Sequence, residues 1–141
     1  MEPLAFEDLP EGALLLIDSA PIIYLLEGNP QFAPRFRPLF EAHAAGRLRF
    51  AVTTITVAEV LTGPLQAGNH SLARRYRLLL ESWQPIALDL SIAERAAGLR
   101  ASYGLKLADA VQTATALEIQ ADGLVTHDRD FSRIHLLRIL C

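Results

Sequence analysis

Residues 14–21, with the sequence LLLIDSAP, decide the fold of this 141-residue chain. The apolar run at 14–17 is typical of a strand that is buried on both faces, as the strands of a parallel sheet are. Asp18 and Ser19 end this strand, and Pro21 suits the first turn of a helix that follows. A buried strand that leads directly into a helix indicates an α/β fold.

The same alternation continues along the rest of the chain. The first helix should end at Gly28, and the pattern then predicts helices at 33–45, 55–61, 71–82, 91–103 and 107–119, and strands at 48–54, 86–90, 123–126 and 136–140. Gly63 and Pro64 should end the third helix, and Ser91 with Glu94 forms a capping-box pattern for the fifth. We therefore predict an acidic N-terminal extension at 1–12 and one domain at 13–141, with a central, mainly parallel sheet flanked by helices.

The composition indicates a folded domain outside the membrane. Of the 141 residues, 51% are hydrophobic, which is enough to bury a core. The apolar run at 13–17 is too short to cross a bilayer, and the acidic N-terminus lacks the basic and apolar order of a signal peptide. Cys141 is the single cysteine, so an internal disulfide is excluded. We expect a cytoplasmic protein.

The net charge of −3 does not exclude a nucleic-acid partner. Four of the 16 acidic residues lie in the extension and four form the candidate site described below, which leaves eight against 13 basic residues. Twelve of the basic residues are arginine, which binds phosphate with two parallel hydrogen bonds. The candidates for contacts with a nucleic acid, which a solvated helix surface explains equally well, are Arg35, Arg37, Arg74, Arg75 and Tyr76.

Four acidic side chains stand near the C-terminal ends of predicted strands. Asp18 ends the first strand, and Glu59 lies in the helix after the second. Asp109 opens the helix that precedes the strand at 123–126, and Asp128 follows that strand. Because ligands of open α/β sheets bind beyond the C-terminal ends of the strands, these acids can converge on one site.

The mutual repulsion of four clustered carboxylates must be offset by other interactions. At an effective dielectric constant of ~20 and a spacing of ~5 Å, each like-charged pair costs about 3 kcal/mol. The cluster must therefore bind a cation, bind protons or spread apart. Oxygen ligands favour Mg²⁺ or Mn²⁺, and such an ion suits phosphodiester hydrolysis. A zinc site would require cysteine or histidine at motif spacing, which this chain lacks.

Each acid also has a structural explanation. Asp18 can cap the next helix, and Glu59 stands three residues after Thr56 in a capping-box pattern. Asp109 suits the positive end of a helix dipole. Asp128, with Asp130, can cap a short turn. The acids interpreted as plain surface charges are Asp89, Glu118 and Asp122.

Four segments together resemble, in order, the motifs of the PIN-domain family, in particular the VapC-type toxins of bacterial toxin–antitoxin pairs. They are LLIDSAPIIYLLEGNP at 15–30, TTITVAEVLTG at 53–63, LKLADAVQTATALEIQA at 105–121 and LVTHDRDF at 124–131. The resemblance covers nearly all of the chain from residue 14 onward. It implies the parallel sheet with flanking helices that the alternation of elements also predicts.

The resemblance implies an acidic quartet formed by Asp18, Glu59, Asp109 and Asp128. Asp18 and Asp109 would bind Mg²⁺ (or Mn²⁺) directly, Glu59 and Asp128 would bind a second ion or metal-bound water, and Ser19 and Thr126 match supporting positions. The implied activity is that of a metal-dependent endoribonuclease that leaves a 5′-phosphate. The implied partners are an RNA substrate, a cognate antitoxin and a second copy in a homodimer.

Two positions depart from the family pattern. Ala108 replaces a frequent proline, and His127 replaces a frequent asparagine and offers a pH-sensitive hydrogen bond near the metal. Among other enzymes, a haloacid dehalogenase-type phosphatase would need an aspartate at position 20, where this chain has alanine. A nucleotide-binding module would need a phosphate-binding glycine loop. The alternative that stays open is a PIN-like RNA- or protein-binding module without catalysis.

Overall fold

The computed structural model describes residues 3–141, apart from the side chain of Ser132. Its centre is a five-stranded sheet in the order β3-β2-β1-β4-β5, with parallel pairing throughout. The strands are β1 (Ala13–Ile17), β2 (Leu48–Thr53), β3 (Pro85–Ile86), β4 (Gly123–Val125) and β5 (Ile139–Leu140). The α/β fold with a parallel sheet, which the alternation of elements predicts, is confirmed.

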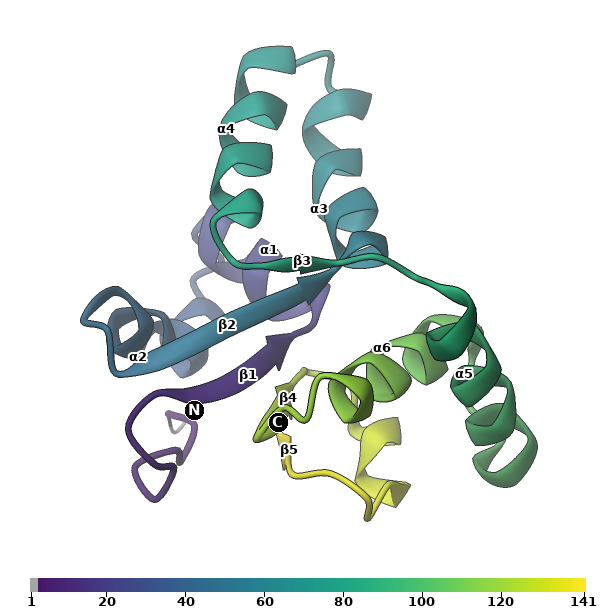
Figure 1. Cartoon of the computed structure of the whole chain (residues 1–141). Coiled ribbons are helices and arrows are strands. Elements are labelled where there is room, and N and C mark those ends of the chain that lie inside the picture. Colours follow the sequence, from purple (N-terminus) through teal and green to yellow (C-terminus); the bar gives the residue numbers. More distant parts are fainter. Residues whose placement is uncertain (1–2) are drawn as a thin grey trace.

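Helices connect these strands. They are α1 (Ser19–Glu27), α2 (Ala33–Ala44), α3 (Thr54–Gln66), α4 (His70–Glu81), α5 (Leu90–Tyr103) and α6 (Leu107–Glu118), with the 3₁₀ helix η1 (Arg129–Arg133) after β4. In Figure 1, α3 and α4 form a hairpin that projects beyond the end of β2, and α5 and α6 form a second pair. Within residues 3–141, no helix is long and apolar enough to span a bilayer.

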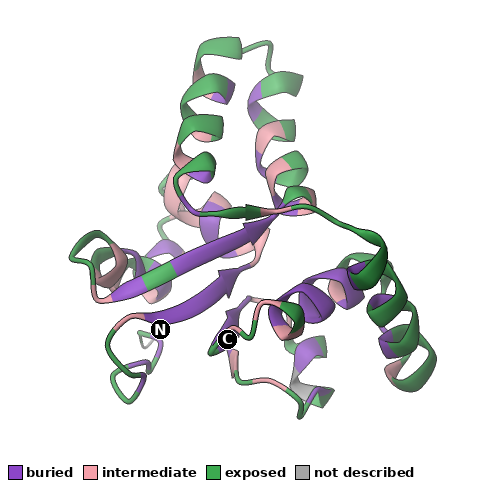
Figure 2. Ribbon diagram, viewed as in Figure 1, coloured by how far each residue is buried: buried purple, intermediate pink, exposed green. Residues whose placement is uncertain are grey.

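The apolar run of β1 is buried on both faces, as its sequence predicts. Leu15 and Ile17 pack in one cluster with side chains of α1 and α2, such as Ile22 and Phe36. Leu14 and Leu16 belong to another cluster, which includes Ala116 of α6. Figure 2 shows β1 in the buried colour along its length, whereas the outer half of the α3–α4 hairpin is mostly in the exposed colour. Helices therefore cover both faces of the sheet.

The prediction that Gly63 and Pro64 end the third helix is wrong. Helix α3 runs to Gln66, and Ala67 donates a backbone hydrogen bond to the Gly63 carbonyl at 3.1 Å. A proline ring inside a helix removes one backbone hydrogen bond. Pro64 is buried within this helix, close to its C-terminal end.

The capping box predicted at Ser91 and Glu94 is also wrong. Helix α5 begins at Leu90, and its N-cap is Asp89, whose carboxylate accepts a hydrogen bond from Ile92 N at 2.9 Å. The expected strand at 86–90 is therefore reduced to β3. Asp89 is exposed, as expected, but it has a structural role that its interpretation as a plain surface charge missed.

Asp122 and Glu118 are likewise more than surface charges. Asp122 Oδ2 accepts a hydrogen bond from the backbone of Leu14 at 2.8 Å, which ties the start of β4 to β1. Glu118 accepts a hydrogen bond from Ser91 and lies 3.6 Å from Arg95, so it joins α6 to α5. These contacts link segments that are distant in sequence, and local patterns carry no sign of them.

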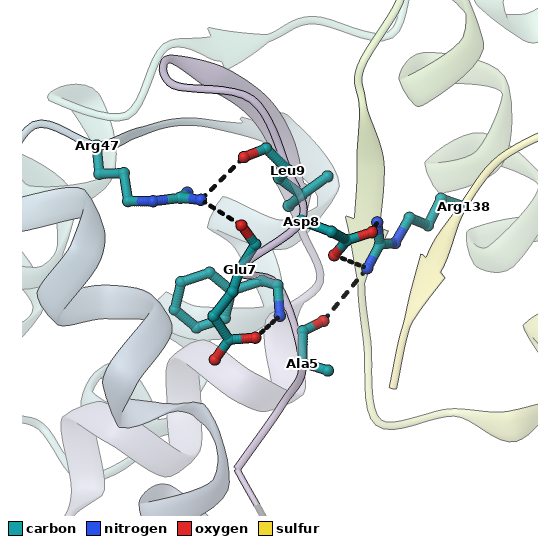
Figure 3. Close-up of polar contacts among 7 residues, drawn as sticks. Ala5, Glu7, Asp8, Leu9, Arg47 and Arg138 are labelled. Carbon is teal, nitrogen blue, oxygen red and sulfur yellow. Dashed lines mark hydrogen bonds and ion pairs between the residues drawn. The ribbon is translucent and has the colours of Figure 1, made fainter.

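The described part of the N-terminal extension packs against the domain. Leu4, Phe6 and Leu9 are buried in the same cluster as β1 and β2. Figure 3 shows two arginines that hold this segment. Arg138 pairs with the Asp8 carboxylate and donates to the Ala5 carbonyl, while Arg47 donates to the carbonyls of residues 7 and 9.

Candidate functional site

The structure brings together the four acids that the sequence singles out. Asp18 follows β1, Asp128 follows β4, Glu59 lies in the second turn of α3, and Asp109 lies in the first turn of α6. All four line one depression of about 330 Å³ at the C-terminal ends of the strands. The parallel crossovers place these ends side by side, because β1 lies between β2 and β4.

The carboxylate of Asp18 is fixed on both oxygens. Oδ1 accepts hydrogen bonds from Ser19 N and from Gln112 Nε2, each at 2.9 Å. Oδ2 accepts one from Thr126 Oγ1 at 2.8 Å. Asp18 therefore caps α1, as its position suggests, and at the same time faces the depression. Ser19 contacts Asp18 through its backbone N–H and Thr126 does so through its hydroxyl; both are positions that the family resemblance implied as supporting ones.

Asp109 lies among other carboxylates. Its oxygens and those of Asp128 and Asp130 approach within 4.8 Å of one another. Burial, followed by the negative charges of Asp128 and Asp18, raises the pKa of Asp109 to about 6, and Lys106 acts in the opposite direction. The cost that the sequence predicts for clustered acids is visible here, because this carboxyl group binds a proton more readily than an isolated one.

This donor set fits a hard divalent cation. Carboxylate oxygens are the ligands that Mg²⁺ and Mn²⁺ prefer, and three of them close together can share one ion. Asp130, which the sequence suggested only as a cap, belongs to this group. Its backbone N–H also donates to Asp128 Oδ1 at 2.9 Å, so the predicted capped turn is present as η1.

Glu59 is not the end of a capping box. The N-cap of α3 is Thr53, whose hydroxyl accepts the hydrogen bond from Thr56 N at 3.1 Å. Glu59 therefore lies one turn deeper in α3 than a capping residue would. Burial, followed by the charge of Asp18, raises the pKa of Glu59, while a hydrogen bond with Ser19 acts in the opposite direction. With the capping explanation removed, Glu59 is an acid turned toward other acids.

Gln112 is a site residue that sequence reasoning missed. Its side chain is buried, lines the depression and donates hydrogen bonds to Asp18 and to Thr56 Oγ1. The signal was available, since Gln112 follows Asp109 by three positions and such residues share a helix face. Gln112 nevertheless does not stand out in the sequence, because a single glutamine in an alanine-rich helix belongs to no motif.

His127 has an aromatic setting at the margin of the depression. Its Nδ1 atom lies 2.7 Å from the hydroxyl of Tyr24, and its ring centroid lies 4.6 Å from that of Phe32. Ala108, the other departure from the family pattern, also lines the depression. Among the described residues that line it, there are none of the five arginine and tyrosine candidates for RNA contacts.

Comparison with known proteins agrees with this architecture. The PIN domain family matches residues 15–136. A chain from a toxin–antitoxin complex of Klebsiella pneumoniae is 31% identical, over 86% of this chain and 92% of that chain, with a TM-score of 0.70. A search of curated proteins gave no match.

More distant solved structures share the fold. A chain of VapBC2 from Rickettsia felis, bound to a promoter DNA fragment, is 17% identical over 89% of this chain and 96% of its own, with a TM-score of 0.71. VapC20 of Mycobacterium tuberculosis, a toxin that cleaves the sarcin–ricin loop, is 14% identical over 90% and 99%, with a TM-score of 0.67. On the family match over most of its length, and on its parallel α/β fold, the chain belongs to the PIN-domain family.

Proposed function

We propose that this protein is a metal-dependent endoribonuclease and the toxin of a type II toxin–antitoxin pair. The observation that carries the proposal is the convergence of Asp18, Glu59, Asp109 and Asp128 on one depression of a PIN domain. The similar chain from Klebsiella pneumoniae belongs to a toxin–antitoxin complex, and the structural neighbour VapC20 is a toxin that cleaves the sarcin–ricin loop. These neighbours support the class of reaction and of partner.

Asp109, Asp128 and Asp130 would hold Mg²⁺ or Mn²⁺, together with Asp18, which lines the same depression. The grouping of the first three oxygens within 4.8 Å supports their part, and the negative charge of Asp18 acts on Asp109 directly. When bound, the ion would neutralise these charges and stabilise the negative charge that develops on the phosphate.

Asp18 and Glu59 would have separate roles in the reaction. Asp18 is held in one orientation by three hydrogen bonds, so it needs no rearrangement when the substrate binds. Glu59, with its raised pKa, would orient the attacking water and accept its proton on the carboxylate. The water oxygen would bond to phosphorus as the bond from phosphorus to the 3′ oxygen breaks, and the released 3′ oxygen would take up a proton from solvent, so that the products are a 5′-phosphate and a 3′-hydroxyl.

RNA and an antitoxin are the partners that follow from this proposal, and the family resemblance adds a second copy of the chain as a proposed partner. The depression is open and lined by acidic side chains, so a basic or metal-bridged ligand would be required to fill it. An antitoxin segment that covers it would block access to RNA.

The test uses purified protein and a pool of structured cellular RNAs, with Mg²⁺, with Mn²⁺ or with excess EDTA. Asp18→Asn is tested in parallel, and the ends of the fragments are sequenced. We expect cleavage that requires the metal and falls by at least about a hundredfold in the variant, since partners that only orient metal ligands already contribute 10- to 100-fold. Cleavage that persisted in Asp18→Asn would contradict the site. Metal binding with intact RNA would instead favour a binding module without catalysis.

A further inference from the structure

Gln112 stands out because a buried amide at this position is not required by the fold. The residue is 2% exposed and lies between buried alanine and valine residues of α6, such as Val111 and Ala114. Its Nε2 group donates to Asp18 Oδ1 at 2.9 Å and to Thr56 Oγ1 at 2.8 Å. Its Oε1 atom is buried and has no hydrogen-bond partner among the described residues.

An unpartnered buried acceptor destabilises a protein, whereas an apolar side chain of similar shape would remove that cost. Packing alone therefore does not explain glutamine here. The two acceptors of Nε2 explain its orientation, since the opposite orientation of the amide would turn Oε1 toward the negative Asp18 carboxylate. The amide nitrogen is thus bonded to Asp18, while the amide oxygen has no hydrogen-bond partner among the described residues.

The amide also joins the elements that carry the acids. Gln112 lies three residues after Asp109 on α6, and Thr56 lies three residues before Glu59 on α3. Thr56 is itself anchored to Thr53, the N-cap of α3, with the two hydroxyl oxygens 3.3 Å apart. A single side chain thus connects α6, α3 and the end of β1.

We propose that Gln112 is a positioning residue of the nuclease: its amide fixes the Asp18 carboxylate at a set distance from Asp109 and Glu59. This inference rests on the proposed function, because it concerns the same acidic site. It assigns to Gln112 a role in metal binding and turnover that is separable from stability.

The test compares Gln112→Met, which keeps the length of the side chain but has no donor, with Thr115→Val. Thr115 is a matched control, because its buried hydroxyl bonds only to the Val111 carbonyl of the same helix among the contacts that the described residues make. For each protein, calorimetry gives the Mn²⁺ affinity, urea unfolding in EDTA gives the stability, and cleavage of RNA gives kcat and KM.

We expect Gln112→Met to bind Mn²⁺ about 10- to 100-fold more weakly and to lose kcat by a similar factor, with KM changed less than about twofold. Its unfolding midpoint in EDTA should change little, because the loss of the two hydrogen bonds donated by Nε2 is offset by removal of the unpartnered oxygen. Thr115→Val should keep its Mn²⁺ affinity and kcat. If Gln112→Met does not fold, Gln112→Leu takes its place in the same measurements.

Wild-type Mn²⁺ affinity in the folded variant would overturn the inference, whether or not RNA is cleaved. An equal loss of affinity in Thr115→Val would also overturn it, since the effect would then be a general one of α6. Weaker Mn²⁺ binding without cleavage by any of the proteins would contradict the proposed nuclease and leave the positioning role supported. A wild-type protein that bound no Mn²⁺ would overturn both.

Discussion

Asp8 and Asp109 lie at opposite ends of the parallel sheet and have opposite surroundings. Asp8 precedes β1, and both of its carboxylate oxygens meet the Arg138 guanidinium, at 2.6 and 2.9 Å. This hydrogen bonding lowers the pKa of Asp8. Asp109 lies at the C-terminal ends of the strands, where burial and then the charges of Asp128 and Asp18 raise its pKa to about 6.

The difference separates a carboxylate whose surroundings favour its negative charge from one whose surroundings disfavour it. At the N-terminal end, the Arg138 guanidinium pairs with Asp8 and donates to the Ala5 carbonyl, and these contacts bind the extension to the domain. At the C-terminal end, the acids face one another. An arrangement that costs stability in the absence of a ligand is typical of a functional site.

The largest expected effect concerns the N-terminal end. Phe6 is 8% exposed and packs in the main core, so Phe6→Ala should reduce the free energy of unfolding by about 3 kcal/mol. Cleavage of RNA per folded molecule should not change, because the residue is remote from the acids. Urea unfolding and a cleavage assay on the same samples test both. Leu78→Ala, at a side chain that is 60% exposed, is the matched control and should cost less than about 0.5 kcal/mol.

A smaller effect is expected for the pH dependence of the free energy of unfolding, which arises from Asp109 at the C-terminal ends of the strands. The pKa of Asp109 is higher in the folded protein than in the unfolded chain, so the folded state binds the extra proton between about pH 4 and 6. Metal-free protein should therefore lose stability as pH rises through this window. Because the group is partly exposed, we expect the loss to be about 1 kcal/mol.

Urea unfolding in EDTA at several pH values measures this loss. Asp109→Asn should abolish this part of the pH dependence and be more stable than the wild type above pH 6, although its cleavage activity should be lost. A variant that was less stable than the wild type at every pH would show that Asp109 supports the fold rather than the site.

The smallest effect is expected from the ion pair of the extension. Asp8→Asn should slightly destabilise the protein at neutral pH, because the pair with Arg138 is exposed and screened by salt. The lowered pKa of Asp8 means that its contribution is present above the unfolded value and is lost as pH falls through the folded one. The destabilisation should therefore vanish in strong acid and at high salt. An increase of the effect with salt would contradict this explanation.

Much of the fold could be predicted from local sequence. The buried run at 14–17 indicates a strand covered on both faces, and the alternation of elements indicates a parallel sheet. Parallel strands have their C-terminal ends at one side, which is why Asp18 and Asp128 could be expected near each other without any structure. Glu59 and Asp109 were candidates from their places in helices next to these strands, and the family motifs supported both. These inferences depend on short-range patterns that the sequence contains.

Tertiary contacts decided the rest. Pro64 lies inside α3, where it is buried. Asp89 rather than Ser91 caps α5, because the helix begins at Leu90, one residue earlier than its sequence predicts. Gln112 meets Asp18 across 94 positions of sequence, and Asp130 joins Asp109 from η1. By itself, the sequence determined which strands form and which acids can converge. Only the packing of α6 and α3 against the ends of the strands decided which polar side chains contact these acids. Such contacts join residues that are far apart in sequence, and no local pattern encodes their distances in space.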